Sequence, residues 1–325
     1  MQVLEGFAAS LAAVVQSQKR RAFSASAQLE NDVRDICDAV AARGDIALLE
    51  FSRKFDCPTL ELSQIRVDER EIEAAWHALE PDARRALERA AKNIAAFHEL
   101  QKPRDFLVPS PDGALLGNRF TAIERVGIYA PNGRAAYPST VLMLAVPARV
   151  AGVREIVLAT PASRDGKAHP VILAAAHLAG IREIYLTGGA TAMAAFAYGT
   201  ATVPKVDKIV GPGSIYMTLA KKHLFGVVGV DGLYGPSEVA VVADSTPDPA
   251  SLAPQLAADL LAQAEHGGDS FVAFISPSQA LCNAVLRELS LQTSASARAK
   301  MASESLKNSL VCHVESIEKA CELCD

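Results

Sequence analysis

The chain has 325 residues, a length typical of about two domains and sufficient for a sizeable core. Hydrophobic residues make up 50% of the chain and charged residues 21%, which excludes a disordered protein. Thirty-two Lys and Arg against 37 Asp and Glu leave a net charge of −5. This balance argues against a protein that binds nucleic acid or an acidic membrane surface.

No segment predicts membrane insertion or export. The longest apolar stretch, residues 141–153, contains Pro147 and Arg149 and is shorter than the ~20 residues that span a bilayer. At the N-terminus Glu5 precedes the apolar run and the basic cluster follows it, which is the reverse of a secretory signal. We therefore expect a cytoplasmic protein.

Six cysteines are too few for a disulfide framework in a chain of this length. Three of them, Cys312, Cys321 and Cys324, lie near the end of the chain, and the last two have metal-ligand spacing. A structural zinc site needs four ligands, and no second pair follows. We therefore do not favour a metal site in this tail, whose role the sequence leaves open.

The first hundred residues read mainly as helices. Residues 30–43 are amphipathic, because their apolar positions recur at helical spacing (Val33, Ile36, Cys37 and Val40). A second short helix is expected over 45–51, and one or two more over 68–101, with Pro81 marking a helix start. The Pro-rich polar segment 102–113 is expected to be a loop.

From Val126 onward, short β-type runs alternate with alanine-rich stretches of helical length. The first four runs begin at Val126, Glu155, Glu183 and Asp207, and each leads through Gly, Pro or Thr into a helix. The alternation continues after residue 236, with a weak last strand candidate at 309–314. Such alternation predicts right-handed βαβ units and a parallel sheet.

Ligands of such sheets bind at the carboxyl ends of the strands, so the turns there are the candidate sites. Tyr129 ends the first strand before an Asn-Gly turn and is placed to lay its ring on a flat ligand; on this stretch alone, a core tyrosine is the favoured alternative. Gly188-Gly189 opens a helix and lets backbone approach a phosphate, although it is not a G-x-G-x-x-G motif. Ser214 follows Gly-Pro-Gly and is either a helix N-cap or a ligand contact. Together these turns suggest a dinucleotide crevice.

A further pair of candidates closes the helix after residue 249. Gln263 and His266 are three residues apart and therefore share a helix face. As an isolated pair they are more simply explained by a histidine that favours the helix dipole, because glutamine is an unusual metal ligand.

Four runs together resemble the histidinol dehydrogenase family. They are YAPNGRAAYPSTVLMLAVPARVAG, VPKVDKIVGPGSIYMTLAK, GPSEVAVVAD and, as the most specific, DLLAQAEHGGDS. The helical N-terminal region also fits that family, so the likeness covers essentially the whole chain.

The resemblance implies a homodimeric enzyme that uses zinc and NAD to oxidise L-histidinol to L-histidine through L-histidinal, in histidine biosynthesis. It implies that Gln263 and His266 bind zinc and meet the substrate, that Ser237 contacts the substrate, and that Tyr129 lines the NAD site. Thr191 and Ser214 stand where the family has glutamine and asparagine in the NAD site, so we expect weaker NAD contacts there.

Two departures from the family bear on activity. The segment 231–234, ending in Tyr234, replaces a small proline-containing stretch next to the substrate site. The family's catalytic Glu-His pair and its remaining zinc ligands, an Asp and a His, have no counterpart before Asp325. We therefore expect the C-terminal catalytic part to be missing from this chain, which assigns no catalytic residue and predicts little or no histidinol oxidation by the chain alone.

Two alternatives stay open beside this interpretation: a catalytically silent paralogue that keeps the NAD site, and an NAD-dependent dehydrogenase of a different alcohol. The architecture that we expect is α/β, with two Rossmann-like parallel-sheet domains, one inserted in the other. A helical N-terminal arm covers 1–28, the first domain 29–125 and 237–325, and the inserted nucleotide-type domain 126–236.

Overall fold

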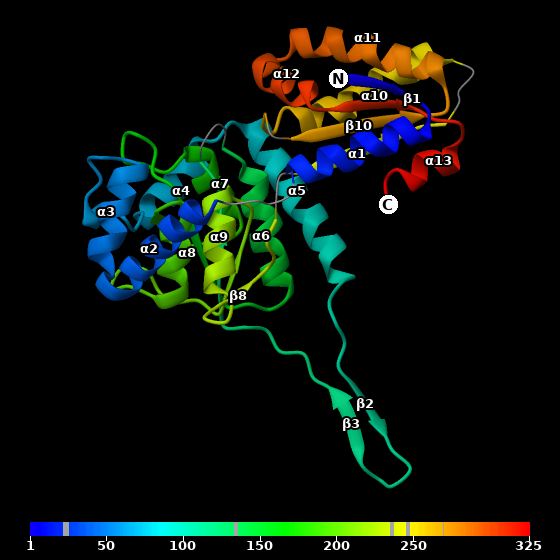
Figure 1. The fold of residues 1–325 in the computed structure, drawn as a ribbon. Helices are drawn as coiled ribbons and strands as arrows, with labels where there is room; N and C mark the ends of the chain where they lie inside the picture. Colours follow the sequence, from blue (N-terminus) through cyan, green and yellow to red (C-terminus); the bar gives the residue numbers. More distant parts are fainter. Residues whose placement is uncertain (22–25, 133–135, 235–236, 245–247, 269) are drawn as a thin grey trace. The chain divides into compact units, whose positions relative to one another are not determined.

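The computed structural model describes residues 1–21, 26–132, 136–234, 237–244, 248–268 and 270–325 (Figure 1). The chain forms two compact units. The terminal unit consists of Met1–Ser24 and Tyr234–Asp325, and the central unit consists of Ala25–Leu233.

The helices that begin the central unit follow the apolar spacing of the sequence. Helix α2 starts after Ser26, whose side chain accepts a hydrogen bond from the Leu29 amide, and it buries the four predicted positions of residues 30–43. Pro81 begins a helix as predicted. The elements are α2 (Ala27–Arg43), α3 (Asp45–Phe55), the short 3-10 helix η1 (Leu62–Gln64), α4 (Glu69–Ala78) and α5 (Pro81–Glu99).

The central unit contains a five-stranded parallel sheet with strand order β6-β5-β4-β7-β8. Its strands are β4 (Arg125–Tyr129), β5 (Glu155–Thr160), β6 (Glu183–Leu186), β7 (Lys208–Val210) and β8 (Gly229–Val230). The chain runs outward from β4 to β6 and then returns to the other side of β4. The strand order therefore reverses between β4 and β7, which is where open α/β sheets bind ligands.

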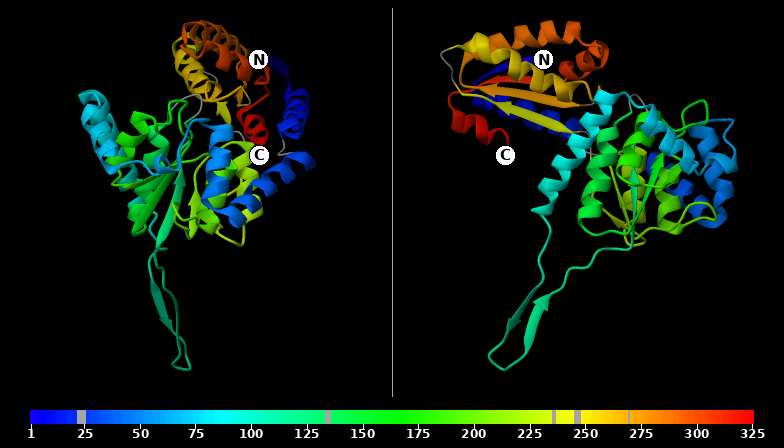
Figure 2. Two further views of the ribbon diagram at one scale, coloured as in Figure 1. Left: turned by 90° about the vertical axis from the view of Figure 1, so that its left-hand side faces the viewer. Right: turned by 180° about the vertical axis from the view of Figure 1, so that it is seen from behind.

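Helices cover both faces of this sheet (Figures 1 and 2). On one face α6 and α7 contact each other, and α4 and α5 pack against them; α8 and α9 form the other layer with α2 and α3. Coverage of both faces explains why β4, β5 and β6 are nearly continuous apolar runs. The connecting helices are α6 (Pro138–Val150), α7 (Pro170–Leu178), α8 (Gly189–Tyr198) and α9 (Ile215–Leu224).

A β-hairpin occupies part of the segment that we expected to be a loop. Strands β2 (Phe106–Pro109) and β3 (Leu115–Asn118) pair antiparallel, and every residue of both is exposed. Gly117 permits the pairing, because a Cβ there would overlap the Phe106 carbonyl oxygen. We did not predict these strands, because they are short and flanked by polar residues.

The terminal unit has a four-stranded parallel sheet with strand order β1-β11-β10-β9. The strands are β1 (Gln2–Glu5), β9 (Glu238–Val242), β10 (Phe271–Ser276) and β11 (Leu310–His313). Helices α10 and α11 pack on the sheet with α12, whereas α1 and α13 form separate contacts with it. Alternate residues of β10 enter two different core clusters. The helices are α1 (Phe7–Arg21), α10 (Pro249–Ala264), α11 (Gln279–Ala295), α12 (Ala299–Lys307) and α13 (Ile317–Glu322).

The observed division of the chain differs from the expected one in two places. Residues 29–125 group with the nucleotide-type sheet rather than with residues 237–325. The N-terminal segment begins with β1, which pairs with β11 at the edge of the terminal sheet, before its helix starts. The reason is packing: α2 to α5 bury their apolar sides on the helices of the central sheet.

The sequence led us to expect neither a disulfide framework nor a membrane-spanning segment. The six cysteines are free, and four of them are buried. Within the described ranges, no helix is long and apolar enough to cross a bilayer.

Candidate functional site

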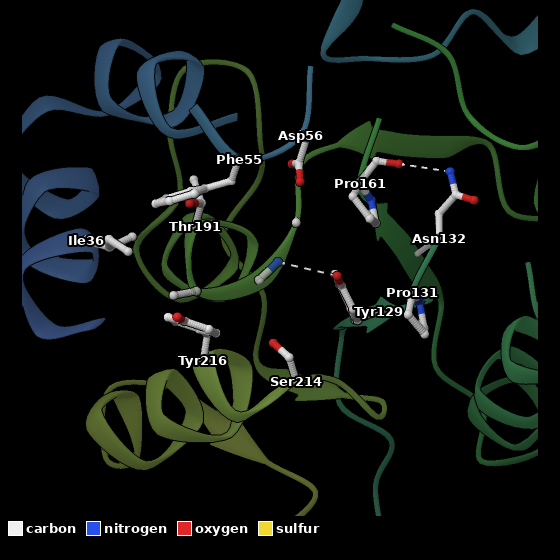
Figure 3. Close-up of a pocket in the computed structure, with 13 residues that line it drawn as sticks. Ile36, Phe55, Asp56, Tyr129, Pro131, Asn132, Pro161, Thr191, Ser214 and Tyr216 are labelled. Atoms are coloured by element: carbon white, nitrogen blue, oxygen red, sulfur yellow. Dashed lines mark hydrogen bonds between the residues drawn. The ribbon is translucent and has the colours of Figure 1, made fainter. Parts of the chain in front are cut away.

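A pocket of about 440 Å³ lies in the central unit, at the carboxyl ends of four of its strands (Figure 3). Residues that follow β4, β5, β6 and β7 all contribute to it, so it spans the point where the strand order reverses. Its lining is Ile36, Phe55, Asp56, Tyr129, Pro131, Asn132, Pro161, Gly188, Gly189, Ala190, Thr191, Ser214 and Tyr216.

Tyr129 ends β4 and forms part of the pocket wall. Its side chain is buried, and its hydroxyl accepts a hydrogen bond from the Gly189 amide at 3.4 Å. Burial raises the pKa of Tyr129 to about 12, with a smaller contribution from the nearby charge of Asp56. The phenol is therefore neutral at physiological pH and offers its proton as a hydrogen-bond donor.

Two other predicted residues line the same pocket as Tyr129. Thr191 lies in the first turn of α8 and is buried. Ser214 is the N-cap residue of α9, which confirms the position expected for it, and its side chain makes no cap hydrogen bond. Figure 3 shows its hydroxyl on the pocket side, so the structure brings together three residues from three different turns.

Asp56 is the residue of this pocket that sequence reasoning missed. It follows the last residue of α3, and its carboxylate lies against the backbone of Gly188. Burial raises the pKa of Asp56 to about 6, while the backbone of Gly188 opposes that rise. Nothing in the helical N-terminal region marks this residue, because only the fold carries the end of α3 to the strand ends.

Asn132 holds the turn after β4 against the turn after β5. Its side-chain amide donates to the Pro161 carbonyl at 3.3 Å and to the Ser163 hydroxyl at 3.0 Å. The following residues 133–135 of the predicted Asn-Gly turn lie outside the described residues. These bonds fix two walls of the pocket relative to each other.

A buried ion pair anchors the turn that carries Ser214. The Lys221 ammonium donates to the Gly211 carbonyl and to the Asp231 carboxylate, both at 2.6 Å, and Asp231 in turn accepts from the Gly211 amide at 2.8 Å. Gly211 has a φ of +128°, and a Cβ there would lie 2.6 Å from the Tyr129 carbonyl oxygen. The turn can therefore approach β4 only with glycine at this position.

The remaining predicted residues lie in the terminal unit. Ser237 precedes β9, and its carbonyl accepts from the Gln263 side-chain amide at 3.5 Å; Gln263 also donates to the Ser270 hydroxyl at 3.4 Å. Helix α10 ends at Ala264, so the exposed His266 lies just past the helix rather than in its last turn. Residues 235–236 and 269 of the two motifs lie outside the described residues.

The donor set for a metal in this cluster is partial. The Nδ1 atom of His266 lies 2.8 Å from the Ala262 carbonyl oxygen, a contact that orients the ring as in metal-bound histidines. Among the residues that the structure describes, no group of three or more His, Cys, Asp or Glu side chains converges on one point. Gln263 and His266 are therefore two donors where zinc takes four.

This chain matches known histidinol dehydrogenases in sequence. The sequence model of the family "Histidinol dehydrogenase" matches residues 19–325. Curated relatives include the histidinol dehydrogenases of Synechococcus sp. (46% identity over 295 residues, 90% of this chain and 67% of that protein) and Rhodopseudomonas palustris (50% over 277 residues, 85% and 63%). The chain thus spans about two thirds of the length of these relatives.

A solved structure is similar over almost the whole chain. The crystal structure of histidinol dehydrogenase from Elizabethkingia anophelis matches with a TM-score of 0.90 and 36% identity. The match covers 99% of this chain and 73% of that one.

Proposed function

This chain belongs to the histidinol dehydrogenase family of oxidoreductases, and on that premise we propose that it takes part in the zinc-assisted, NAD-dependent oxidation of L-histidinol to L-histidine through L-histidinal. The observation that carries the proposal is the pocket at the strand ends, where Tyr129, Thr191 and Ser214 converge. As a member of a biosynthetic family, the protein is inferred to work in the cytoplasm.

The chemistry of the pocket fits a nucleotide cofactor. Phe55, Tyr129 and Tyr216 supply aromatic surface, and Thr191 and Ser214 add hydroxyl groups. Bound NAD supplies a hydride acceptor for the alcohol carbon. The role of these residues is to bind and orient the cofactor, while the apolar walls exclude water from it.

Zinc binding is proposed for the cluster in the terminal unit. Gln263 and His266 supply two ligands, and Ser237 lies beside Gln263 as the proposed substrate contact. A zinc ion held there would polarise a substrate hydroxyl. The amide of Gln263 is kept in place by its bonds to Ser237 and Ser270.

Titration of the purified protein with NAD in a calorimeter, followed by an NADH absorbance assay with L-histidinol and zinc, tests the proposal. NAD binding with little or no turnover of L-histidinol is the result expected for this chain alone, because no catalytic residue is assigned in it. Turnover of other alcohols alone supports a changed substrate, and efficient turnover of L-histidinol contradicts the expectation that the catalytic part is missing. Absence of NAD binding refutes the assignment of the pocket.

The zinc site has its own test in two histidine variants. We expect His266→Ala to lower zinc affinity at least tenfold, because it removes a ligand. His223→Ala serves as the control, because His223 lies in the central unit and contacts Asp38 at 3.5 Å. Equal zinc affinity of both variants and the unmodified protein removes His266 from the metal site.

A homodimer is proposed from the β2–β3 hairpin. Phe106, Val108 and Leu116 lie on one face of it and Leu107 and Leu115 on the other, and all five are exposed. A two-stranded hairpin with apolar side chains on both faces is not stable by itself in water. A second copy of the chain covers it in this proposal.

Sedimentation analysis of a Leu107→Glu, Leu116→Glu double variant tests the dimer. We expect a monomer, whereas Leu291→Glu on the exposed surface of α11 leaves the dimer intact. A dimeric double variant excludes the hairpin as the interface.

A further inference from the structure

Asp56 occupies the place at the start of α8 where dinucleotide folds commonly bind a phosphate. In such folds the free amides at the N-terminus of a helix face the pyrophosphate. Here the Asp56 carboxylate lies against the backbone of Gly188, and the Gly189 amide donates to the Tyr129 hydroxyl. Figure 3 shows the Asp56 carboxylate pointing from α3 toward the start of α8.

The close approach of the carboxylate excludes a phosphate at this point. A Cβ built on Gly188 would lie 3.1 Å from both carboxylate oxygens of Asp56 and 3.0 Å from the Pro161 Cβ. The carboxylate therefore lies next to the ends of β5 and β6, against bare glycine backbone. A phosphate that sought the Gly188 amide would meet both this occupied space and a like charge.

Among the described residues that line the pocket, no Lys, Arg or His balances the charge of Asp56. The neutral Tyr129 lies near enough for that charge to raise its pKa. An ionised carboxylate without a cationic partner needs hydrogen-bond donors. The acceptor sites of Asp56 can take such donors from a ligand.

The surroundings of the carboxylate favour a nucleoside. Phe55, adjacent to Asp56 in the chain, and Tyr216 present rings into the same pocket, and Ile36 adds aliphatic surface. Flat apolar walls of this kind accept an adenine ring, and the sugar next to it carries two hydroxyl donors. In dinucleotide-binding folds an acidic residue commonly takes the ribose hydroxyls, and here the acid comes from α3 instead of from a strand of the sheet.

We propose that Asp56 determines the cofactor specificity of this pocket: its carboxylate accepts a hydrogen bond from a hydroxyl of the adenosine ribose and rejects a phosphate at that position. The inference rests on the proposed binding of NAD. It pairs Asp56 with a ribose hydroxyl of the cofactor. It also explains why the paired glycines at the start of α8 do not bind a phosphate.

The first experiment compares NAD and NADP binding by calorimetry in three proteins. We expect the unmodified protein to bind NAD at least tenfold more tightly than NADP. Asp56→Asn is expected to weaken NAD binding about tenfold and to bring the two affinities within about threefold of each other. Asp35→Asn, which removes the same charge from an exposed position of α2, leaves both affinities unchanged.

The second experiment uses the unmodified protein, so it does not depend on the folding of a variant. NAD is compared with its analogues that lack the 2′ or the 3′ hydroxyl of the adenosine ribose. At least one analogue is expected to bind at least tenfold more weakly than NAD.

The outcomes separate this inference from the proposed function. If the unmodified protein binds none of these nucleotides, the NAD site itself is refuted. If it binds NAD, but both analogues bind equally well or Asp56→Asn keeps the original preference, the assignment of Asp56 is overturned while the NAD site stands.

Discussion

Replacing Asp56 by Asn is expected to stabilise the free protein at neutral pH. Burial raises the pKa of this carboxyl from an ordinary 3.8 to about 6, so the folded chain binds the proton more tightly than the unfolded chain does. Above pH 6 the folded state must hold the charge, which costs about 3 kcal/mol at 1.36 kcal/mol per pH unit. Asparagine removes the charge and keeps an acceptor oxygen in a side chain of nearly the same size.

The sign of the pH dependence follows from the direction of the pKa change. A raised pKa contributes stability below the unfolded value, and this contribution is lost as the pH rises through the folded value. The gain from Asp56→Asn is therefore expected to grow from about 1.5 kcal/mol at pH 5 to about 3 kcal/mol at pH 7.5. For the central unit, which spans Ala25–Leu233, 3 kcal/mol corresponds to a rise in Tm of about 7 °C.

Urea unfolding of the free protein between pH 5 and pH 8 measures this effect. Asp35→Asn is the matched control, because it removes a charge from an exposed position of the same unit and is expected to change stability by less than about 0.5 kcal/mol. Loss of stability in Asp56→Asn, or a gain that is the same at every pH, would refute the reasoning from burial. A variant that is more stable but binds NAD less well would identify Asp56 as a charge retained for binding.

Two further predictions concern buried groups. Lys221→Met should lower the free energy of unfolding by about 2–4 kcal/mol, because it leaves the Asp231 carboxylate without its buried cation. The control Lys222→Met breaks an exposed ion pair and should lower it by less than about 1 kcal/mol. Equal effects of the two variants in urea unfolding would contradict this prediction. Alkylation of the native protein should modify only the exposed thiols of Cys321 and Cys324, whereas all six cysteines should react after unfolding. An intact mass spectrum of the native protein with more than two rapidly formed adducts would show that the buried thiols are accessible.

Much of the fold could be predicted from local patterns. The strand runs at Val126, Glu155 and Glu183 and the amphipathic helix over 30–43 were all correctly expected, because apolar period and turn residues are properties of neighbouring positions. The parallel direction of these strands was also predicted, because strands that alternate with helices form βαβ units. The hairpin was missed because its apolar strands are short and lie among prolines and polar residues.

The candidate site was predictable only in part. Tyr129, Thr191 and Ser214 lie at strand ends, and strand ends of a parallel sheet meet at one edge, so the sequence by itself indicated that they converge. The N-cap position of Ser214 was also predicted, whereas the absence of a side-chain cap hydrogen bond was not, because that bond depends on the rotamer of one hydroxyl.

What the sequence by itself determined about this protein is its α/β class, its family and the strand-end residues of its pocket. Only the tertiary structure decided that α2 to α5 pack on the helices of the central sheet and that the end of α3 brings Asp56 to Gly188. The physical reason is that contacts between residues more than a hundred positions apart depend on how whole helices pack. The raised pKa of Asp56 is of the same kind, because burial exists only once the chain has folded.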